Sequence, residues 1–263
     1  MTVQDFQEYF LRLKQQAGLP PTLNGDEGLV LGRPETEVTG MLVAWMGTVD
    51  ALEMAAREHC NLVVVHEQFY FYSFWSPERL RPQDLTWRAN RRRIELAEGH
   101  GLSVLRLHGS MDMLHNFEDF VELIGGAVGK RGGGYYRVFP IPETTVAALV
   151  QRLKQTLRLD HVRMVGDLSR RVRCLGVPMG GLCLDSNISY MEWCIEHGAD
   201  CLVGGEADEY GFLLAADAGI PCIETGHFVS ETPGVLNFAR RLQADFPDVK
   251  VVGYDAQRPY VYA

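Results

Sequence analysis

Histidine and carboxylate residues recur in this 263-residue sequence directly after short apolar runs. Four such runs, LVVV, SVLRL, CLVGG and PCIETG, end in this way. Neutral imidazole and ionised carboxylate are the side chains that most often bind divalent cations in proteins. The recurrence therefore predicts a metal site. The residues that follow the four runs are His66 with Glu67, His108 with Asp112, Glu206, and His227 with Glu231.

A single histidine at the end of a strand is more often a hydrogen-bonded structural residue than a ligand. Four strand ends that are each followed by a histidine or a carboxylate favour metal binding, because ligands of open α/β sheets bind beyond the carboxyl ends of the strands. We therefore expect the four ends to converge on one crevice. Two ions that share a carboxylate in such a crevice can activate a water molecule.

Apolar runs alternate with helical spacing along the chain, which predicts an α/β protein made of two α/β units with mixed sheets. Strands are expected at 39–46, 61–65, 102–108, 135–142, 161–167, 171–177, 199–205, 221–226 and 249–255. Helices are expected at 1–16, 49–60, 86–99, 117–128, 142–157, 185–197 and 208–218. A closing helix is expected to begin near Thr232 and Pro233, because a capping residue followed by proline is typical of a helix start.

The glycine-rich run GKRGGGYY (129–136) is the clearest linker in the sequence. It predicts a first unit at 1–128 and a second unit at 129–263, with a C-terminal segment that can pack back on the first. A second glycine-rich stretch, 177–187, precedes a helix and is expected to line the cleft. The aromatic run FYFYSFW (69–75) predicts either a stacking wall for a substrate or a buried contact surface.

Composition excludes several classes of protein. The net charge of −9 argues against general nucleic-acid binding, which needs a basic surface. No apolar run approaches the roughly 20 residues of a membrane span, and the N-terminus lacks the pattern of a signal peptide. We therefore expect a cytoplasmic protein without membrane contact. The six cysteines form no C-x-x-C pair, so they are expected to be buried thiols.

Three segments, read in order, resemble the Nif-three-like family, whose members are often labelled GTP cyclohydrolase 1 type 2. HEQ (66–68) falls where the family has His-His-Pro, and HGSMD (108–112) looks like its His-Thr-Asn-Leu-Asp. GHFVSE (226–231) is similar to its Gly-His-x-x-[ST]-Glu, and VGGE (203–206) to its Thr-Gly-[DE] strand end. The resemblance extends from about Asn24 to Asp255.

The resemblance implies two divalent metal ions (zinc, iron or manganese) in a cleft at the carboxyl ends of strands, and assembly into a homohexamer. His108 and Glu206 match positions that orient ligands or line the cleft. Glu67 stands where the family has a second histidine, and this oxygen donor favours harder ions. The alternative is that Glu67 points elsewhere and only one metal binds well. The implied ligands are His66, Glu67, Asp112, His227 and Glu231.

The resulting functional hypothesis is a metal-dependent hydrolase that acts on a nucleotide or a related small molecule. The proton would be moved by whichever residue does not bind the metal: Glu67, His108 or Glu231. GTP as the substrate follows from the resemblance alone, and the sequence leaves the physiological substrate unknown. Two alternatives stay open: a non-catalytic metal-binding or regulatory assembly protein, and a relative that kept the fold and lost the activity.

Overall fold

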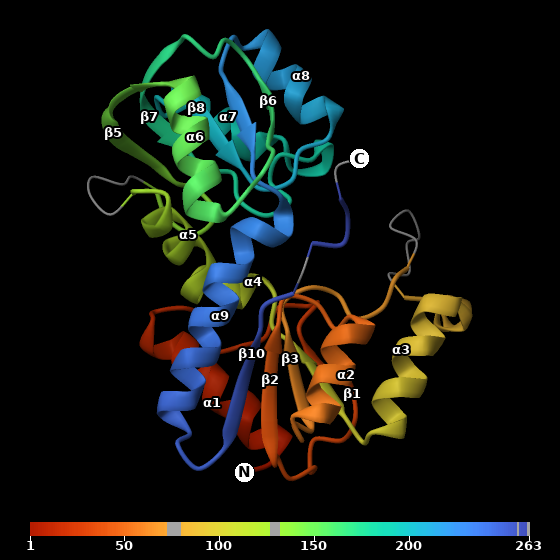
Figure 1. Ribbon diagram of the computed structural model, residues 1–263. Helices are drawn as coiled ribbons and strands as arrows, with labels where there is room; N and C mark the ends of the chain where they lie inside the picture. The colour runs from red at the N-terminus through yellow and green to blue at the C-terminus, as the bar shows by residue number, and fades with distance from the viewer. Residues whose placement is uncertain (73–79, 127–131, 257, 262–263) are drawn as a thin grey trace. The chain divides into compact units, whose positions relative to one another are not determined.

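The computed structural model describes residues 1–72, 80–126, 132–256 and 258–261 (Figure 1). The chain divides into two compact units, each built around its own sheet. Unit 1 contains Met1–Leu114 and Val235–Ala263, and unit 2 contains His115–Gly234. Both sheets have five strands and are mixed, which confirms the α/β class with two mixed sheets.

The sheet of unit 1 has the strand order β1-β4-β3-β2-β10. Four strands run parallel, and β1 pairs with β4 in the antiparallel direction. The carboxyl ends of β3 and β4 therefore lie side by side at one edge of the sheet. The strands are β1 (Gly28–Leu31), β2 (Gly40–Ala44), β3 (Leu62–Val65), β4 (Ser103–Arg106) and β10 (Lys250–Tyr254).

Helices cover both faces of this sheet (Figure 1). Met41 and Val43 of β2 point to one face, where α1 (Val3–Gln16) and the second part of α9 (His227–Asp245) pack. Leu42 and Ala44 point to the other face. This alternation follows from the two-residue period of a strand and explains why β2 and β3, in the interior of the sheet, are apolar throughout. The other face is covered by α2 (Val49–Arg57) and α3 (Arg88–Gly99).

The sheet of unit 2 has the order β5-β7-β8-β9-β6, with β7, β8 and β9 parallel and the two outer strands antiparallel. The strands are β5 (Val138–Thr145), β6 (Arg163–Val165), β7 (Arg171–Gly176), β8 (Cys201–Gly204) and β9 (Cys222–Glu224). One face is covered by α5 (Phe117–Leu123) and α6 (Val146–Leu157), the other by α7 (Ser189–Glu196) and α8 (Glu209–Asp217).

Four short turns of helix complete the described elements. Two of them follow β4: α4 (Gly109–Met111), which comes directly after His108, and η2 (Asp112–Asn116), which begins at Asp112. The turns are η1 (Pro82–Thr86), α4 (Gly109–Met111), the π-helix η2 (Asp112–Asn116) and η3 (Asp185–Asn187).

Helix α9 begins at His227, so the prediction of a start near Thr232 and Pro233 is wrong. The chain turns into the helix at Gly226, whose φ is 103°, and the Ser230 N–H donates to the Gly226 carbonyl at 3.0 Å. Proline is typical of a first helical turn. Inside a helix it removes one N–H bond and its ring crowds the carbonyl four residues earlier, a cost that packing outweighs here. The earlier start places His227 and Glu231 on the same helix, one turn apart.

The boundary between the units differs from the expected 128/129. Phe117 and Phe120 of α5 are buried in the core of unit 2, so that unit begins before the glycine-rich run. The chain from Val235 onward belongs to unit 1. Apolar burial defines a unit more directly than glycine content does. Residues 129–131 of the expected linker and 73–75 of the aromatic run lie outside the described residues.

Among the described residues, no helix is both long and apolar enough to span a membrane. The six cysteines are free thiols, and Cys174 alone among them is partly exposed. Their positions agree with the expectation of buried thiols.

Candidate functional site

Backbone hydrogen bonds fix His66 and Glu67 at the carboxyl end of β3. The His66 N–H donates to the Ala44 carbonyl at 3.2 Å, and the Glu67 N–H donates to the Trp45 carbonyl at 2.7 Å. These bonds continue the parallel ladder beyond the last residue of the strand. Consecutive residues of an extended chain point to opposite sides. His66 is accordingly fully buried, whereas Glu67 is partly exposed.

The turn that follows β4 places His108 and Asp112 one above the other. The N–H groups of Met111 and Asp112 donate to the His108 carbonyl at 2.8 and 3.2 Å. Glu27 closes the start of this turn by accepting from the Ser110 N–H at 2.8 Å and from its hydroxyl at 2.7 Å. A helical turn aligns residues four apart, so both side chains point the same way.

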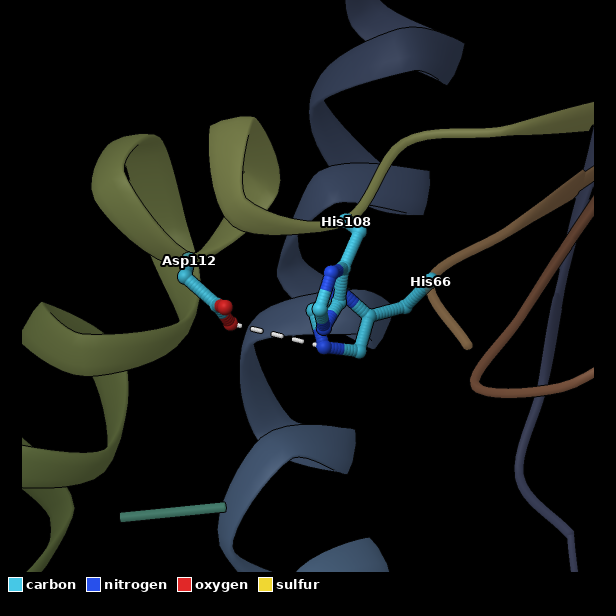
Figure 2. Close-up of side chains that lie close together, drawn as sticks. All are labelled: His66, His108 and Asp112. Carbon is cyan, nitrogen blue, oxygen red and sulfur yellow. Dashed lines mark ion pairs between the residues drawn. The ribbon is translucent and has the colours of Figure 1, made fainter. Parts of the chain in front are cut away.

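His66, His108 and Asp112 form a compact group in unit 1 (Figure 2). Each offers one ligand atom, and these atoms all lie within 4.8 Å of one another. His66 Nε2 is 3.4 Å from Asp112 Oδ1, and the two imidazole ring centres are 5.0 Å apart. His66 and Asp112 are buried, and burial of a carboxylate requires a partner that compensates its charge.

Asp26, on the loop before β1, fixes the orientation of His108. His108 Nδ1 lies 2.7 Å from Asp26 Oδ2, a hydrogen bond in which the ring nitrogen donates. This bond lowers the pKa of Asp26 to about 2, so that carboxylate is ionised. With Nδ1 carrying the proton, the lone pair of His108 is on Nε2. A carboxylate on the far nitrogen is the usual way in which a metal-binding imidazole is held in place.

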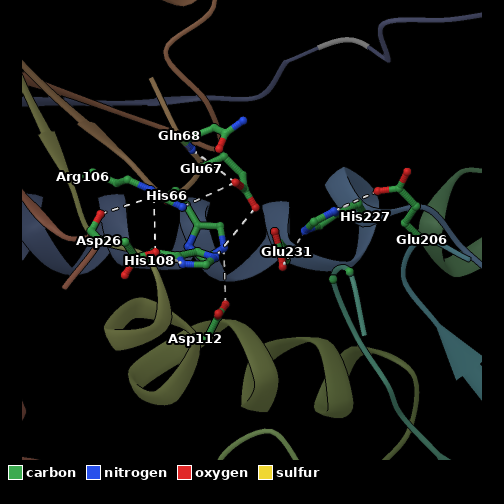
Figure 3. A network of polar contacts seen from close by, with 12 residues as sticks. Asp26, His66, Glu67, Gln68, Arg106, His108, Asp112, Glu206, His227 and Glu231 are labelled. Carbon is green, nitrogen blue, oxygen red and sulfur yellow. Dashed lines mark hydrogen bonds and ion pairs between the residues drawn. The ribbon is translucent and has the colours of Figure 1, made fainter. Parts of the chain in front are cut away.

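Glu67 and Arg106 occupy the other side of the same group (Figure 3). Arg106 Nη2 is 3.7 Å from Glu67 Oε2, and His108 Nε2 is 3.9 Å from Glu67 Oε1. A ligand atom of Glu67 also lies within 4.8 Å of one of His66. Glu67 can thus reach a cation bound by His66. Its carboxylate also lies beside the guanidinium of Arg106.

Unit 2 contains the second set of expected residues. His227 Nε2 is 3.2 Å from Glu231 Oε1, one turn further along α9. His227 Nδ1 is 3.1 Å from Glu206 Oε2, beyond the end of β8 (Figure 3). Glu231 is buried, whereas Glu206 is exposed. The imidazole therefore lies between two carboxylates, and Glu206 contacts it in the orienting position that the family resemblance implies.

A glycine loop packs directly against Glu231. A Cβ atom on Gly180 would lie 2.1 Å from Glu231 Oε1, and Gly180 has a φ of +59°. The Gly180 N–H donates to Ser230 Oγ at 3.0 Å, which ties the loop to α9. Both the space and the backbone conformation require glycine here. Gly180 thus contacts a candidate ligand of unit 2, and the expectation that the stretch 177–187 lines a cleft stays a prediction.

The seven residues that sequence analysis selected fall into two groups, one in each unit. Their convergence on one crevice stays a prediction. Two residues of the unit 1 group, Asp26 and Arg106, were missed. Arg106 carries a recognisable signal, because a charged residue in a fully buried parallel strand needs a partner. Asp26 carries none, because acidic residues are common in glycine-rich loops. The selected residues are His66, Glu67, His108 and Asp112 in unit 1, and Glu206, His227 and Glu231 in unit 2.

Comparison with known proteins agrees with this architecture. A GTP cyclohydrolase 1 type 2 homolog of Clostridium acetobutylicum is 23% identical over 230 residues, covering 82% of this chain and 81% of the relative. A Neisseria meningitidis protein with the same name is 24% identical over 215 residues, covering 80% of each.

Solved structures share the fold across the whole chain. A Bacillus cereus protein related to NIF3 has a TM-score of 0.80 at 14% identity, covering 100% of this chain and 99% of that one. A Thermus thermophilus protein has a TM-score of 0.68 at 22% identity, covering 99% and 100%. Residues 3–259 match the family described as Duf34/NIF3 (NGG1p interacting factor 3). The chain therefore belongs to the Duf34/NIF3 family.

Proposed function

We propose that this protein is a divalent-metal-dependent hydrolase, and that His66, His108 and Asp112 hold a catalytic ion. The observation that carries the proposal is the approach of two imidazoles and a carboxylate at the ends of adjacent parallel strands. This donor set suits zinc, iron and manganese. Members of the same family named GTP cyclohydrolase 1 type 2 homolog support a nucleotide or a related small molecule as the substrate.

The spacing of the donor atoms fits a metal ion. A tetrahedral ion with ligand bonds of about 2.1 Å separates neighbouring donor atoms by about 3.4 Å. The distance between His66 Nε2 and Asp112 Oδ1 is 3.4 Å. In the neutral imidazole of His108, the hydrogen bond from Nδ1 to Asp26 selects the tautomer with its lone pair on Nε2, the nitrogen that would bind the ion. Three protein donors also leave a position for water, as catalytic sites require.

When bound, a divalent ion supplies Lewis acidity and lowers the pKa of a water molecule. The residues around it then decide where the proton goes. Glu67 is partly exposed and 3.9 Å from His108 Nε2, so an ionised Glu67 can accept a proton from water next to the imidazoles. We propose Glu67 as the general base, with the guanidinium of Arg106 3.7 Å from its carboxylate.

The proposal extends to unit 2. The family resemblance assigns His227 and Glu231 to metal binding, and their 3.2 Å separation is compatible with a shared ion. Glu206 would orient His227, as Asp26 orients His108. Assembly into a homohexamer belongs to the same set of proposals, and light scattering on the purified protein decides it.

The test is metal analysis of purified protein together with turnover of a nucleotide panel that includes GTP. We expect stoichiometric divalent metal in the wild type, and loss of metal and turnover in His66→Ala and Asp112→Asn. Glu53→Gln, an exposed position on α2, is the control. Metal without turnover of any substrate would support the non-catalytic alternative. Wild-type protein that binds no divalent ion under metal-replete conditions would refute the proposal.

A further inference from the structure

Arg106 brings a permanent positive charge into the candidate metal site. Its side chain is 9% exposed and lies at the end of β4. Nε donates to the His66 carbonyl at 3.2 Å, and Nη1 donates to the Asp26 carbonyl at 3.3 Å. Nη1 is also 3.3 Å from Asp26 Oδ2, while Nη2 faces Glu67 at 3.7 Å. The guanidinium is therefore fixed by backbone acceptors and aimed at two carboxylates.

The charges of this group favour one divalent ion over two. With both imidazoles neutral, Asp26, Glu67 and Asp112 contribute three negative charges, and Arg106 contributes one positive charge. The remaining two negative charges equal the charge of one divalent cation. Arginine does not lose its proton at accessible pH, so this positive charge cannot be removed to admit a second ion.

The position of Arg106 matters as much as its charge. Asp112 is 3.4 Å from His66 and faces the imidazoles, whereas Glu67, like Asp26, faces both Arg106 and His108. A second ion bound through Glu67 would therefore lie close to the guanidinium. Two like charges a few ångströms apart repel strongly where the surroundings are partly buried.

We propose that Arg106 is a built-in counter-charge for Glu67, so that the unit 1 group binds one divalent ion tightly and a second ion at Glu67 only weakly. The tight ion lies between His66, His108 and Asp112. This inference rests on the metal site of the proposed function. It goes beyond that function because it names Arg106 as the residue that determines how many ions the site binds tightly. It selects one ion in place of the two that the family resemblance implies.

The test is a titration of metal-free protein with Mn²⁺ alone, followed by calorimetry and by native mass spectrometry. Every protein in it carries His227→Ala, which disrupts the unit 2 ligand pair, and wild type here means wild type at all other positions. For the wild type we expect one tight ion per chain and a second ion bound at least about tenfold more weakly. Arg106→Met removes the charge and keeps an apolar stem, so the second ion should bind about tenfold or more tightly than in the wild type. Arg106→Lys keeps the charge, so its second ion should stay weak.

Glu67→Gln provides a second measurement that does not alter the buried arginine. Because the tight ion does not need Glu67, this variant should keep the first binding step within about threefold of the wild type, a change well under one charge interaction. Loss of the tight ion in Glu67→Gln would overturn the inference. Two equally tight ions in the wild type would also overturn it, while leaving the proposed function intact. No ion in the wild type would instead refute the proposed function itself.

Discussion

The candidate ligands of unit 1 depend on neighbours that the family motifs do not contain. Asp26 holds the far nitrogen of His108, and Arg106 donates to the backbone of His66 while facing Glu67. An imidazole or carboxylate becomes a good ligand when its orientation is fixed before the ion arrives. At the residue scale, the chemistry of this site therefore depends on hydrogen bonds between side chains that are far apart in the sequence.

Replacing Asp26 by Asn tests this dependence. Asn removes the negative charge that fixes the His108 tautomer, so we expect divalent-ion affinity to fall by about 10- to 100-fold. Calorimetric titration with Mn²⁺ measures the change, and circular dichroism checks the fold. Asp50→Asn, at an exposed position of α2, is the matched control and should leave affinity unchanged. Equal affinities in both variants would show that Asp26 does not position His108.

Gly180 gives a second prediction at the residue scale. Gly180→Ala adds a Cβ that would lie 2.1 Å from Glu231 Oε1, whereas Gly219→Ala adds one into open space. Both positions have a positive φ, +59° and +66°, so both variants share a backbone strain of about 1 kcal/mol. The displaced carboxylate should cost Gly180→Ala roughly 1–3 kcal/mol more. Urea unfolding measures both, and equal losses would contradict the close packing of Glu231.

Helix α9 contributes residues to both units. Its first two turns, with His227 and Glu231, belong to unit 2, and the chain from Val235 onward belongs to unit 1. In unit 1 this second part packs on α1 through Phe238, whose ring is 5.9 Å from that of Phe10 in an edge-to-face arrangement. The part of α9 that follows the candidate ligands is thus held in unit 1 by apolar contacts.

A double-mutant cycle on Phe10 and Phe238 tests this anchor. Both side chains are fully buried, so each alanine substitution should lower the free energy of unfolding by roughly 3–5 kcal/mol. The two losses should be coupled by roughly 0.5–1.5 kcal/mol, because the rings contact each other. Chemical denaturation of the four proteins measures the coupling. Additive losses would mean that the ring contact contributes nothing beyond burial.

At the scale of the whole molecule, buried thiols in both units make the free energy of unfolding depend on pH in the alkaline range. Burial raises the pKa of Cys60, in unit 1, from 9.0 to about 11 and that of Cys194, in unit 2, to about 12. A pKa raised on folding contributes stability that is complete below the pKa of the unfolded thiol. That contribution is lost as the pH rises, because the unfolded chain releases protons first.

We therefore expect the free energy of unfolding to decline from about pH 8.5 upward. Cys60→Ala and Cys194→Ala should each reduce the slope of that decline, while Cys174→Ala, at the partly exposed thiol, is the comparison variant. Urea unfolding at pH 7, 9 and 10 provides the measurement. An unchanged slope in the variants at buried positions would show that these thiols do not carry the pH dependence.

The sequence alone determined the α/β class, the apolar strands and the polar residues that follow four of them. These features are local. The period of a strand or helix, and the residues that follow a strand, depend only on residues that are close together in the sequence. The tertiary structure decided the rest. It assigned the strand ends to two sheets, began α9 at His227, and began unit 2 at His115. Each of these outcomes depends on which apolar faces are buried together.

The site divides in the same way. His66, Asp112, His227 and Glu231 were selected as candidates from residue type and position, and the structure places them in two groups. Asp26 and Arg106 were not found, because Asp26 meets His108 across 82 positions and Arg106 meets Glu67 only through the pairing of adjacent strands. Contacts between distant positions arise from the fold, and for this reason only the tertiary structure could reveal them.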